Sequence, residues 1–93
     1  MTDQVVDIPE RSRFVLERDG EPIGKVLYTR EPGLVTFTHT EVDPAIHEHG
    51  LGSALAKAAL DAVAAEDGTR VVASCPFIAS YIERHPEYQP LLA

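Results

Sequence analysis

One stretch of this 93-residue sequence decides how the rest folds: residues 47–53, which are His47-Glu48-His49-Gly50-Leu51-Gly52-Ser53. It lies between a run rich in β-branched residues, typical of a strand, and an alanine-rich amphipathic run, typical of a helix. Glycines at a strand-to-helix junction let a ligand approach the backbone closely. The first turn of the helix offers unpaired N–H groups and a partial positive charge. The stretch therefore predicts an anion site of the kind that binds phosphate.

Upstream of this stretch, three strand-like runs are separated by tight turns. Apolar residues alternate over residues 13–17, and further strands are predicted over 23–30 and 34–42. The turns are Asp19-Gly20 and Glu31-Pro32-Gly33, both typical of hairpins. The sequence thus predicts a three-stranded antiparallel meander, preceded by a polar lead-in over residues 1–10 with a frayed start.

Downstream, apolar residues recur at helical spacing over residues 52–66, and a short β-branched strand is predicted over 70–74. A helical crossover makes that strand parallel to the third one. Cys75-Pro76 begins a second helix, because proline suits the first helical position, and Pro86 ends it. The order β-β-β-α-β-α defines an α+β fold.

Length and composition limit the classes of protein. With 93 residues the chain is expected to form one domain over residues 1–93, with residues 1–11 as a flexible start. Its net charge of −7 disfavours nucleic acid as a partner, and no apolar run has the roughly 20 residues that a membrane helix needs. A single cysteine fits the reducing cytoplasm, and no set of metal ligands has the spacing of a zinc site.

Cys75 is the first candidate for chemistry outside the glycine stretch. If Pro76 opens a helix, the Cys75 sulfur lies at a helix N-terminus, where the thiolate is favoured. The alternative is that Cys75 is a small buried hydrophobe, which is the usual state of a free cysteine. The glycines have a similar alternative, in which Gly50 and Gly52 only cap and turn the chain.

His39 and Glu41 form a second candidate pair, because residues two apart on a strand share a face. Such a pair has the chemistry of a general base and the group that orients it. Val35 and Phe37 share that predicted face, so the alternative is a histidine that closes the core. Thr40, with Thr38, is expected to point the other way.

Ser80 and Tyr81 lie early in the last predicted helix. Their hydroxyls are candidates for contact with a cofactor that lies between the two helices. For Tyr81 the alternative is a place in the core or at its rim.

At this point the chain resembles a known family, the GNAT superfamily of N-acetyltransferases, whose usual pattern is Gln/Arg-x-x-Gly-x-Gly/Ala after a central strand. Here the pattern is His47-x-x-Gly50-x-Gly52, which departs at its first position. Over residues 12–90 the chain is similar to a small single-domain GNAT-like subfamily. The segments that carry this likeness are His39-Thr40-Glu41-Val42, Gly50-Leu51-Gly52-Ser53-Ala54-Leu55, Cys75-Pro76-Phe77 and Tyr81-Ile82-x-x-His85-Pro86-Glu87-Tyr88.

The resemblance implies a compact GNAT-like fold in which the third strand splays from its parallel neighbour and acetyl-CoA lies in the gap. Carried over by residue, the pyrophosphate would be held by His49, Gly50, Leu51, Gly52 and Ser53. The backbone of Val42 would bond the pantetheine arm, and Cys75 would be the catalytic residue. Larger GNAT enzymes carry helices between their first two strands that help to form the acceptor site. The tight turn at Asp19-Gly20 leaves no room for them, so the acceptor site is open or completed by a partner.

The leading hypothesis is an acetyl-CoA-dependent N-acetyltransferase that acts on an amine of a small molecule or a protein. Cys75 would take the acetyl group or position the thioester, and His39 or Glu41 would relay the amine proton. The alternatives are a CoA-binding module without catalysis and a small protein-interaction domain. Exposed edge strands are compatible with a monomer or a weak homodimer.

Overall fold

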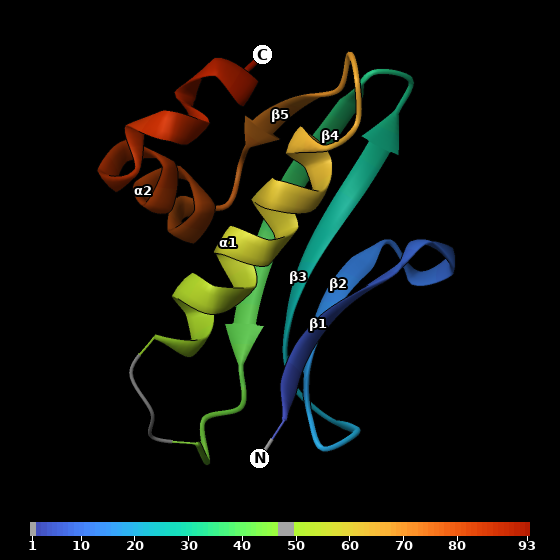
Figure 1. Ribbon diagram of the computed structural model, residues 1–93, viewed down its shortest axis with the longest axis vertical. Helices are drawn as coiled ribbons and strands as arrows, with labels where there is room; N and C mark the ends of the chain where they lie inside the picture. The colour runs from blue at the N-terminus through green and yellow to red at the C-terminus, as the bar shows by residue number, and fades with distance from the viewer. Residues whose placement is uncertain (1, 47–49) are drawn as a thin grey trace.

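The computed structural model describes residues 2–46 and 50–93. A five-stranded sheet has the strand order β1-β2-β3-β4-β5. Helix α1 lies across one face of the sheet, and α2 packs beside it against β4 and β5 (Figure 1). The elements, in chain order, are β1 (Asp3–Ile8), the 3₁₀ turn η1 (Pro9–Arg11), β2 (Arg13–Arg18), β3 (Glu21–Glu31), β4 (Leu34–Val42), α1 (Leu51–Ala64), β5 (Arg70–Ala73), α2 (Pro76–Arg84) and the 3₁₀ segment η2 (Pro86–Leu91).

The expected α+β architecture is confirmed. Strands β2, β3 and β4 form an antiparallel meander, and β5 pairs with β4 in parallel, with Val35 opposite Val71. β4 has the bounds predicted for the third strand, residues 34–42. The other predicted strands are longer or shorter than predicted by at most a few residues. The helical crossover through α1 joins β4 to β5 as the sequence predicts.

The polar lead-in expected over residues 1–10 contains a strand. β1 pairs antiparallel with β2, so the antiparallel part of the sheet has four strands rather than three. Val5 packs against the core, and the Arg18 guanidinium bonds Asp3 at 2.8 Å across the pair. This strand gives little periodic signal, because its polar residues Asp3 and Gln4 are adjacent, as are Val5 and Val6, and apolar and polar residues do not alternate along it.

The core lies between the sheet and the two helices. Phe14, Tyr28 and Phe37 form an aromatic cluster on the inner face of the sheet, with ring centroids 5.4 to 6.3 Å apart. Both helices contribute to the same cluster, since Leu55 of α1 and Ile78 of α2 are fully buried in it. No helix of the described chain covers the opposite face, where Val72 is 36% exposed.

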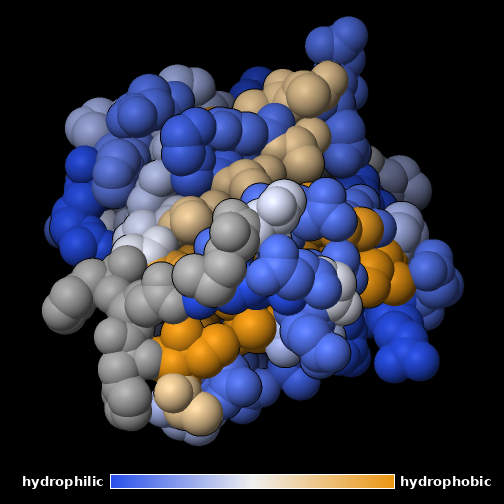
Figure 2. Space-filling view, turned by 60° about the horizontal axis from the view of Figure 1, so that its bottom comes forward, coloured by the Kyte–Doolittle hydropathy of each residue, from blue (hydrophilic) through white to orange (hydrophobic). Residues whose placement is uncertain are grey.

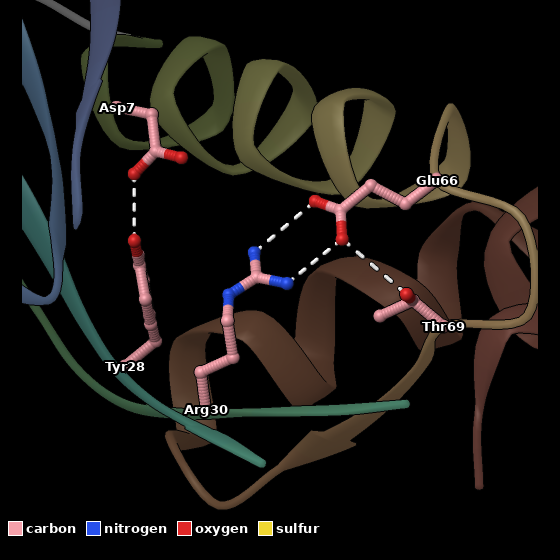
Figure 3. Close-up of polar contacts among 5 residues, drawn as sticks. All are labelled: Asp7, Tyr28, Arg30, Glu66 and Thr69. Carbon is pink, nitrogen blue, oxygen red and sulfur yellow. Dashed lines mark hydrogen bonds and ion pairs between the residues drawn. The ribbon is translucent and has the colours of Figure 1, made fainter. Parts of the chain in front are cut away.

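A set of polar contacts fastens the C-terminal end of α1 to the sheet (Figure 3). The Arg30 guanidinium of β3 donates to both carboxylate oxygens of Glu66, at 2.7 and 3.1 Å, and Thr69 donates to the same carboxylate. Nearby, the Tyr28 hydroxyl donates to Asp7 at 2.7 Å. Burial and the Asp7 carboxylate raise the pKa of Tyr28 to about 12. These contacts tie β1, β3 and α1 together at the end away from the glycine stretch.

Over the described residues, no helix has both the length and the apolar character needed to cross a membrane.

Candidate functional site

Pairing between β4 and β5 stops before β4 ends. The last paired residues are Phe37 and Ala73, after which the Cys75 N–H donates to the Phe37 carbonyl at 2.9 Å. Within the part of the chain that the structure describes, residues 39–42 pair with β3 alone. Among the described residues, the backbone N–H and C=O groups of residues 39–42 that point away from β3 face no strand. The implied splay of the parallel pair is therefore present, with Val42 at its end.

The N-terminus of α1 lies at this same end of the sheet. Gly50 precedes the helix with a φ of 87°, a left-handed conformation that favours glycine. The first helical bond runs from Ala54 to the Gly50 carbonyl at 2.9 Å. The N–H groups of Leu51, Gly52 and Ser53 precede that bond and have no acceptor within the helix. No described side chain caps them and the first turn has no acidic residue, so among the described residues nothing competes with an anion for the positive end of the helix.

Gly52 has a packing role that the sequence does not reveal. A Cβ built at this position would lie 2.7 Å from the Phe77 ring, at its Cζ atom, which is closer than real atoms approach. Phe77 is the second residue of α2 and is 36% exposed. The absence of a side chain at Gly52 thus lets the starts of the two helices come together.

Cys75 and Thr40 meet on the inner face of the splayed strands. Cys75 is 3% exposed and directly precedes α2, and its Sγ lies 3.3 Å from the Thr40 Oγ1. Among the described residues, no histidine or carboxylate contacts this thiol. The expectation that Cys75 lies at the N-terminus of a helix opened by Pro76 is confirmed. Thr40, by contrast, is expected from the sequence on the other face.

A β-bulge explains where Thr40 points. Opposite Leu27 stands His39, but opposite the next residue, Tyr28, stands Phe37, so Thr38 is an extra residue in β4. One extra residue reverses which side chains face the core. The prediction that His39 and Glu41 share a face with Phe37 is therefore wrong. Both are exposed on the outer face, whereas Phe37 is fully buried.

On that outer face, Glu41 forms an ion pair with Lys25, with 3.4 Å between Nζ and Oε2. The strand register places Lys25 opposite Glu41 and Leu27 opposite His39. The structure thus separates the candidate residues across β4: Cys75 lies on one side, and His39 and Glu41 lie on the other.

Of the two α2 candidates, Ser80 is exposed and Tyr81 is 4% exposed. The Tyr81 ring stacks on His85 with centroids 4.0 Å apart and leans on Tyr88 at 5.9 Å. Burial raises the pKa of the Tyr81 hydroxyl above its ordinary value of 10.0. Tyr81 thus packs in the core, which is the alternative interpretation given for it above.

His49 of the predicted pyrophosphate loop lies outside the described residues, as do His47 and Glu48. The surface where β4 ends and α1 begins exposes apolar side chains (Figure 2). Val42, the last residue of β4, and Ile46, which follows it, are half-buried against the core. Within the described ranges, no three potential metal ligands gather closely enough to hold an ion.

Similar folds occur in solved structures of GNAT proteins. The loading GNATL domain of CurA from Lyngbya majuscula matches 71% of this chain and 44% of its own, with 23% identity and a TM-score of 0.58. The GphF GNAT-like decarboxylase in complex with isobutyryl-CoA matches 69% of this chain and 44% of its own, with 23% identity and a TM-score of 0.59.

N-acetylglutamate synthase from Neisseria gonorrhoeae, complexed with coenzyme A and N-acetyl-glutamate, matches 78% of this chain and 18% of its own, at 22% identity and a TM-score of 0.58. This chain therefore spans less than half the length of each of these three structures. No curated protein matches the sequence.

The fold and the open helix N-terminus beside a splayed strand pair define a GNAT-type domain. A family model for GCN5-related N-acetyl-transferases matches residues 13–91. The chain belongs to that family.

Proposed function

We propose that this protein is an acetyl-CoA-dependent N-acetyltransferase. The observation that carries the proposal is the open N-terminus of α1 next to the unpaired edge of β4. Family membership supports it, as do the solved structures of similar fold that contain coenzyme A or an acyl-CoA. When bound, acetyl-CoA supplies an activated thioester, whose acetyl group passes to the amine nitrogen as the C–S bond breaks and one proton moves from nitrogen to sulfur.

The chain's own residues fit this cofactor at two points. The N–H groups of Leu51, Gly52 and Ser53 are three donors at the positive end of a 14-residue helix, which suits a pyrophosphate. The backbone of Val42, at the end of the unpaired strand edge, suits the amide groups of the pantetheine arm. His49 and Gly50 would complete the loop around the phosphates, and Ser80 would lie on the exposed side of α2.

Cys75 is assigned a positioning role in direct transfer. A nucleophilic cysteine needs a base beside it or a strongly favoured thiolate. The described surroundings of Cys75 offer a threonine hydroxyl at 3.3 Å and almost no contact with solvent. We infer that the Thr40–Cys75 pair lines the inner wall of the acyl site and that no acetyl-cysteine forms.

We assign the group that accepts the proton of the acceptor amine to the outer face of β4. Glu41 and His39 are exposed there, and Glu41 is a carboxylate that an ammonium group can approach. Either residue can accept the amine proton where the thioester, in the gap between the splayed strands, meets the outer face. Glu41 is the better suited of the two for binding an ammonium group, because its side chain is a carboxylate, although it must share that carboxylate with Lys25.

The proposal is tested by incubating the protein with acetyl-CoA and a panel of amines and following both free CoA and acetylated product by mass spectrometry. Glu41→Gln is expected to lower kcat/KM at least tenfold without changing the affinity for acetyl-CoA. Glu31→Gln is the matched control, since Glu31 lies at the far end of β3. Tight acetyl-CoA binding without product for any amine would instead indicate a CoA-binding module. No binding at all would indicate an interaction domain.

A further inference from the structure

A pocket of about 640 Å³ lies on the face of the sheet that the described helices leave open. Its walls come from the turn between β1 and β2, from β2 and β3, and from the end of β4. Its size falls within the range of roughly 300–1,000 Å³ that is usual for small-molecule sites. Because Val42 and Glu41 belong to its lining, the pocket borders the strand assigned above to the cofactor.

The pocket carries three cationic side chains beside three carboxylates, on a chain that is strongly acidic as a whole. Three of its eight lysines and arginines line it: Arg11, Arg13 and Lys25. Lys25 pairs with Glu41, but among the described residues neither arginine has a carboxylate partner. The only bond that either guanidinium makes there is from Arg13 Nε to the Arg11 carbonyl, at 3.2 Å. With a net charge of −7, two unneutralised guanidinium groups in one pocket indicate an anionic ligand group.

The backbone between the two arginines is held in an uncommon conformation. Ser12 has a φ of 53° and a ψ of 51°, in the left-handed region. A residue with a Cβ adopts this conformation only where surrounding contacts hold it. Two backbone bonds fix it, from the Ser12 N–H to Pro9 at 3.1 Å and from the Tyr28 N–H to the Ser12 carbonyl at 3.0 Å. The turn thus holds Arg11 and Arg13 on the same pocket.

The remaining walls of the pocket carry two other chemistries. Negative charge comes from Glu17 of β2 and from Glu41 and Asp43, which lie at and just after the end of β4, on the wall assigned to the acceptor amine. Val15, Ile23 and Val42 supply apolar surface. A ligand that satisfies all three walls carries an ammonium group, an apolar side chain and an acid.

We propose that this pocket binds the acceptor, and that the acceptor is an amine that also carries a carboxylate, in the size range of an apolar amino acid to a dipeptide. Its carboxylate lies on Arg11 and Arg13, and its amine lies toward Glu41. The role as an acceptor rests on the proposed acetyl transfer, whereas the binding itself does not.

The test is a titration of the full chain, with and without saturating acetyl-CoA, followed by backbone amide shifts in NMR spectra. The probes are L-leucine and L-leucyl-L-leucine, each compared with its C-terminal amide, which keeps the amine and removes the acid. At least one acid is expected to bind ten or more times tighter than its amide, with shifts centred on residues 11–13 and 41–43. Arg11→Gln, at an exposed position, is expected to abolish that preference, and Arg13→Gln is expected to do the same. Arg84→Gln, on α2, is the control and is expected to keep it.

Equal binding of acids and amides, or a preference that survives Arg11→Gln and Arg13→Gln, overturns the inference. So does the absence of any probe binding by a protein that binds acetyl-CoA, and in that case the proposed function stands. Acid-selective binding by a protein that does not bind acetyl-CoA supports the pocket and overturns the proposed function instead.

Discussion

The thiol of Cys75 and the hydroxyl of Thr40 lie 3.3 Å apart, across the point where β4 and β5 stop pairing. A β-bulge at Thr38 brings Thr40 to this side, and the start of α2 brings Cys75. Each residue comes from one of the two splayed strands or its extension. Their contact marks the inner wall of the site assigned to the thioester.

Replacement of Cys75 by alanine distinguishes direct transfer from a covalent route. We expect Cys75→Ala to keep at least about a tenth of the wild-type kcat, because the thiol positions the thioester and forms no bond with the acetyl group. Turnover is measured with saturating acetyl-CoA, and intact-mass spectra of the wild type are recorded during turnover. Thr40→Val, which removes the same contact from the other side, is the matched variant. An acetylated wild-type intermediate, together with a loss of three orders of magnitude in Cys75→Ala, would establish the covalent route.

The contact between Gly52 and Phe77 predicts that the effect of Gly52→Ala on the free energy of unfolding depends on whether the Phe77 ring is present. In a Phe77→Ala protein, Gly52→Ala is expected to raise the free energy of unfolding by up to about 1 kcal/mol, the usual gain for this change in a helix. With Phe77 present, the new Cβ at 2.7 Å forces the ring to move, and the gain is lost. Urea denaturation of the wild type, the two single variants and the double variant gives the coupling energy between the two positions, expected at about 0.5 kcal/mol or more. A coupling of zero would show that the ring does not rest on Gly52.

The Arg30–Glu66 ion pair predicts how stability responds to acid. The Arg30 guanidinium lowers the pKa of Glu66 below its ordinary value of 4.5. The pair therefore stabilises the fold fully above that value, and its contribution disappears as the pH falls through the lower, folded-state pKa. Glu66→Gln should be less stable than wild type at about pH 7, with the difference shrinking toward about pH 3.

The measurement is urea denaturation across that pH range, with Glu31→Gln as the control. Glu31 makes no ion pair among the described residues, so its replacement should change stability little at any pH. A difference between wild type and Glu66→Gln that stays constant with pH would mean that the ion pair contributes nothing.

Most of the architecture could be predicted from periodicity and turn residues. Strong alternation, the Asp-Gly and Pro-Gly turns and the alanine-rich stripe each give a local signal, so four strands and two helices were placed to within a few residues. β1 was missed because its polar residues resemble a solvated tail. Its pairing with β2 is a tertiary effect that no local pattern contains.

The bulge at Thr38 could not be predicted, and the candidate site depends on it. Residues 36–40 alternate regularly in sequence, and nothing in their composition marks an extra residue. That one residue turns His39 and Glu41 to the outer face and Thr40 toward Cys75. Phe77 was likewise given no role, because its contact with Gly52 joins two helices that are far apart in the chain.

The most direct test of the acetyl-CoA site is a calorimetric titration of the wild type and Gly52→Asp with acetyl-CoA, accompanied by thermal melting. The wild type is expected to bind, and at 100 times the dissociation constant the ligand should stabilise the fold by about 2.7 kcal/mol. Gly52→Asp places a carboxylate at the helix N-terminus and is expected to abolish binding. Ala64→Asp, at the other end of α1, should bind like the wild type. Wild-type protein whose melting temperature is unchanged by acetyl-CoA, or a Gly52→Asp protein that binds with unchanged affinity, would contradict the assignment of the site.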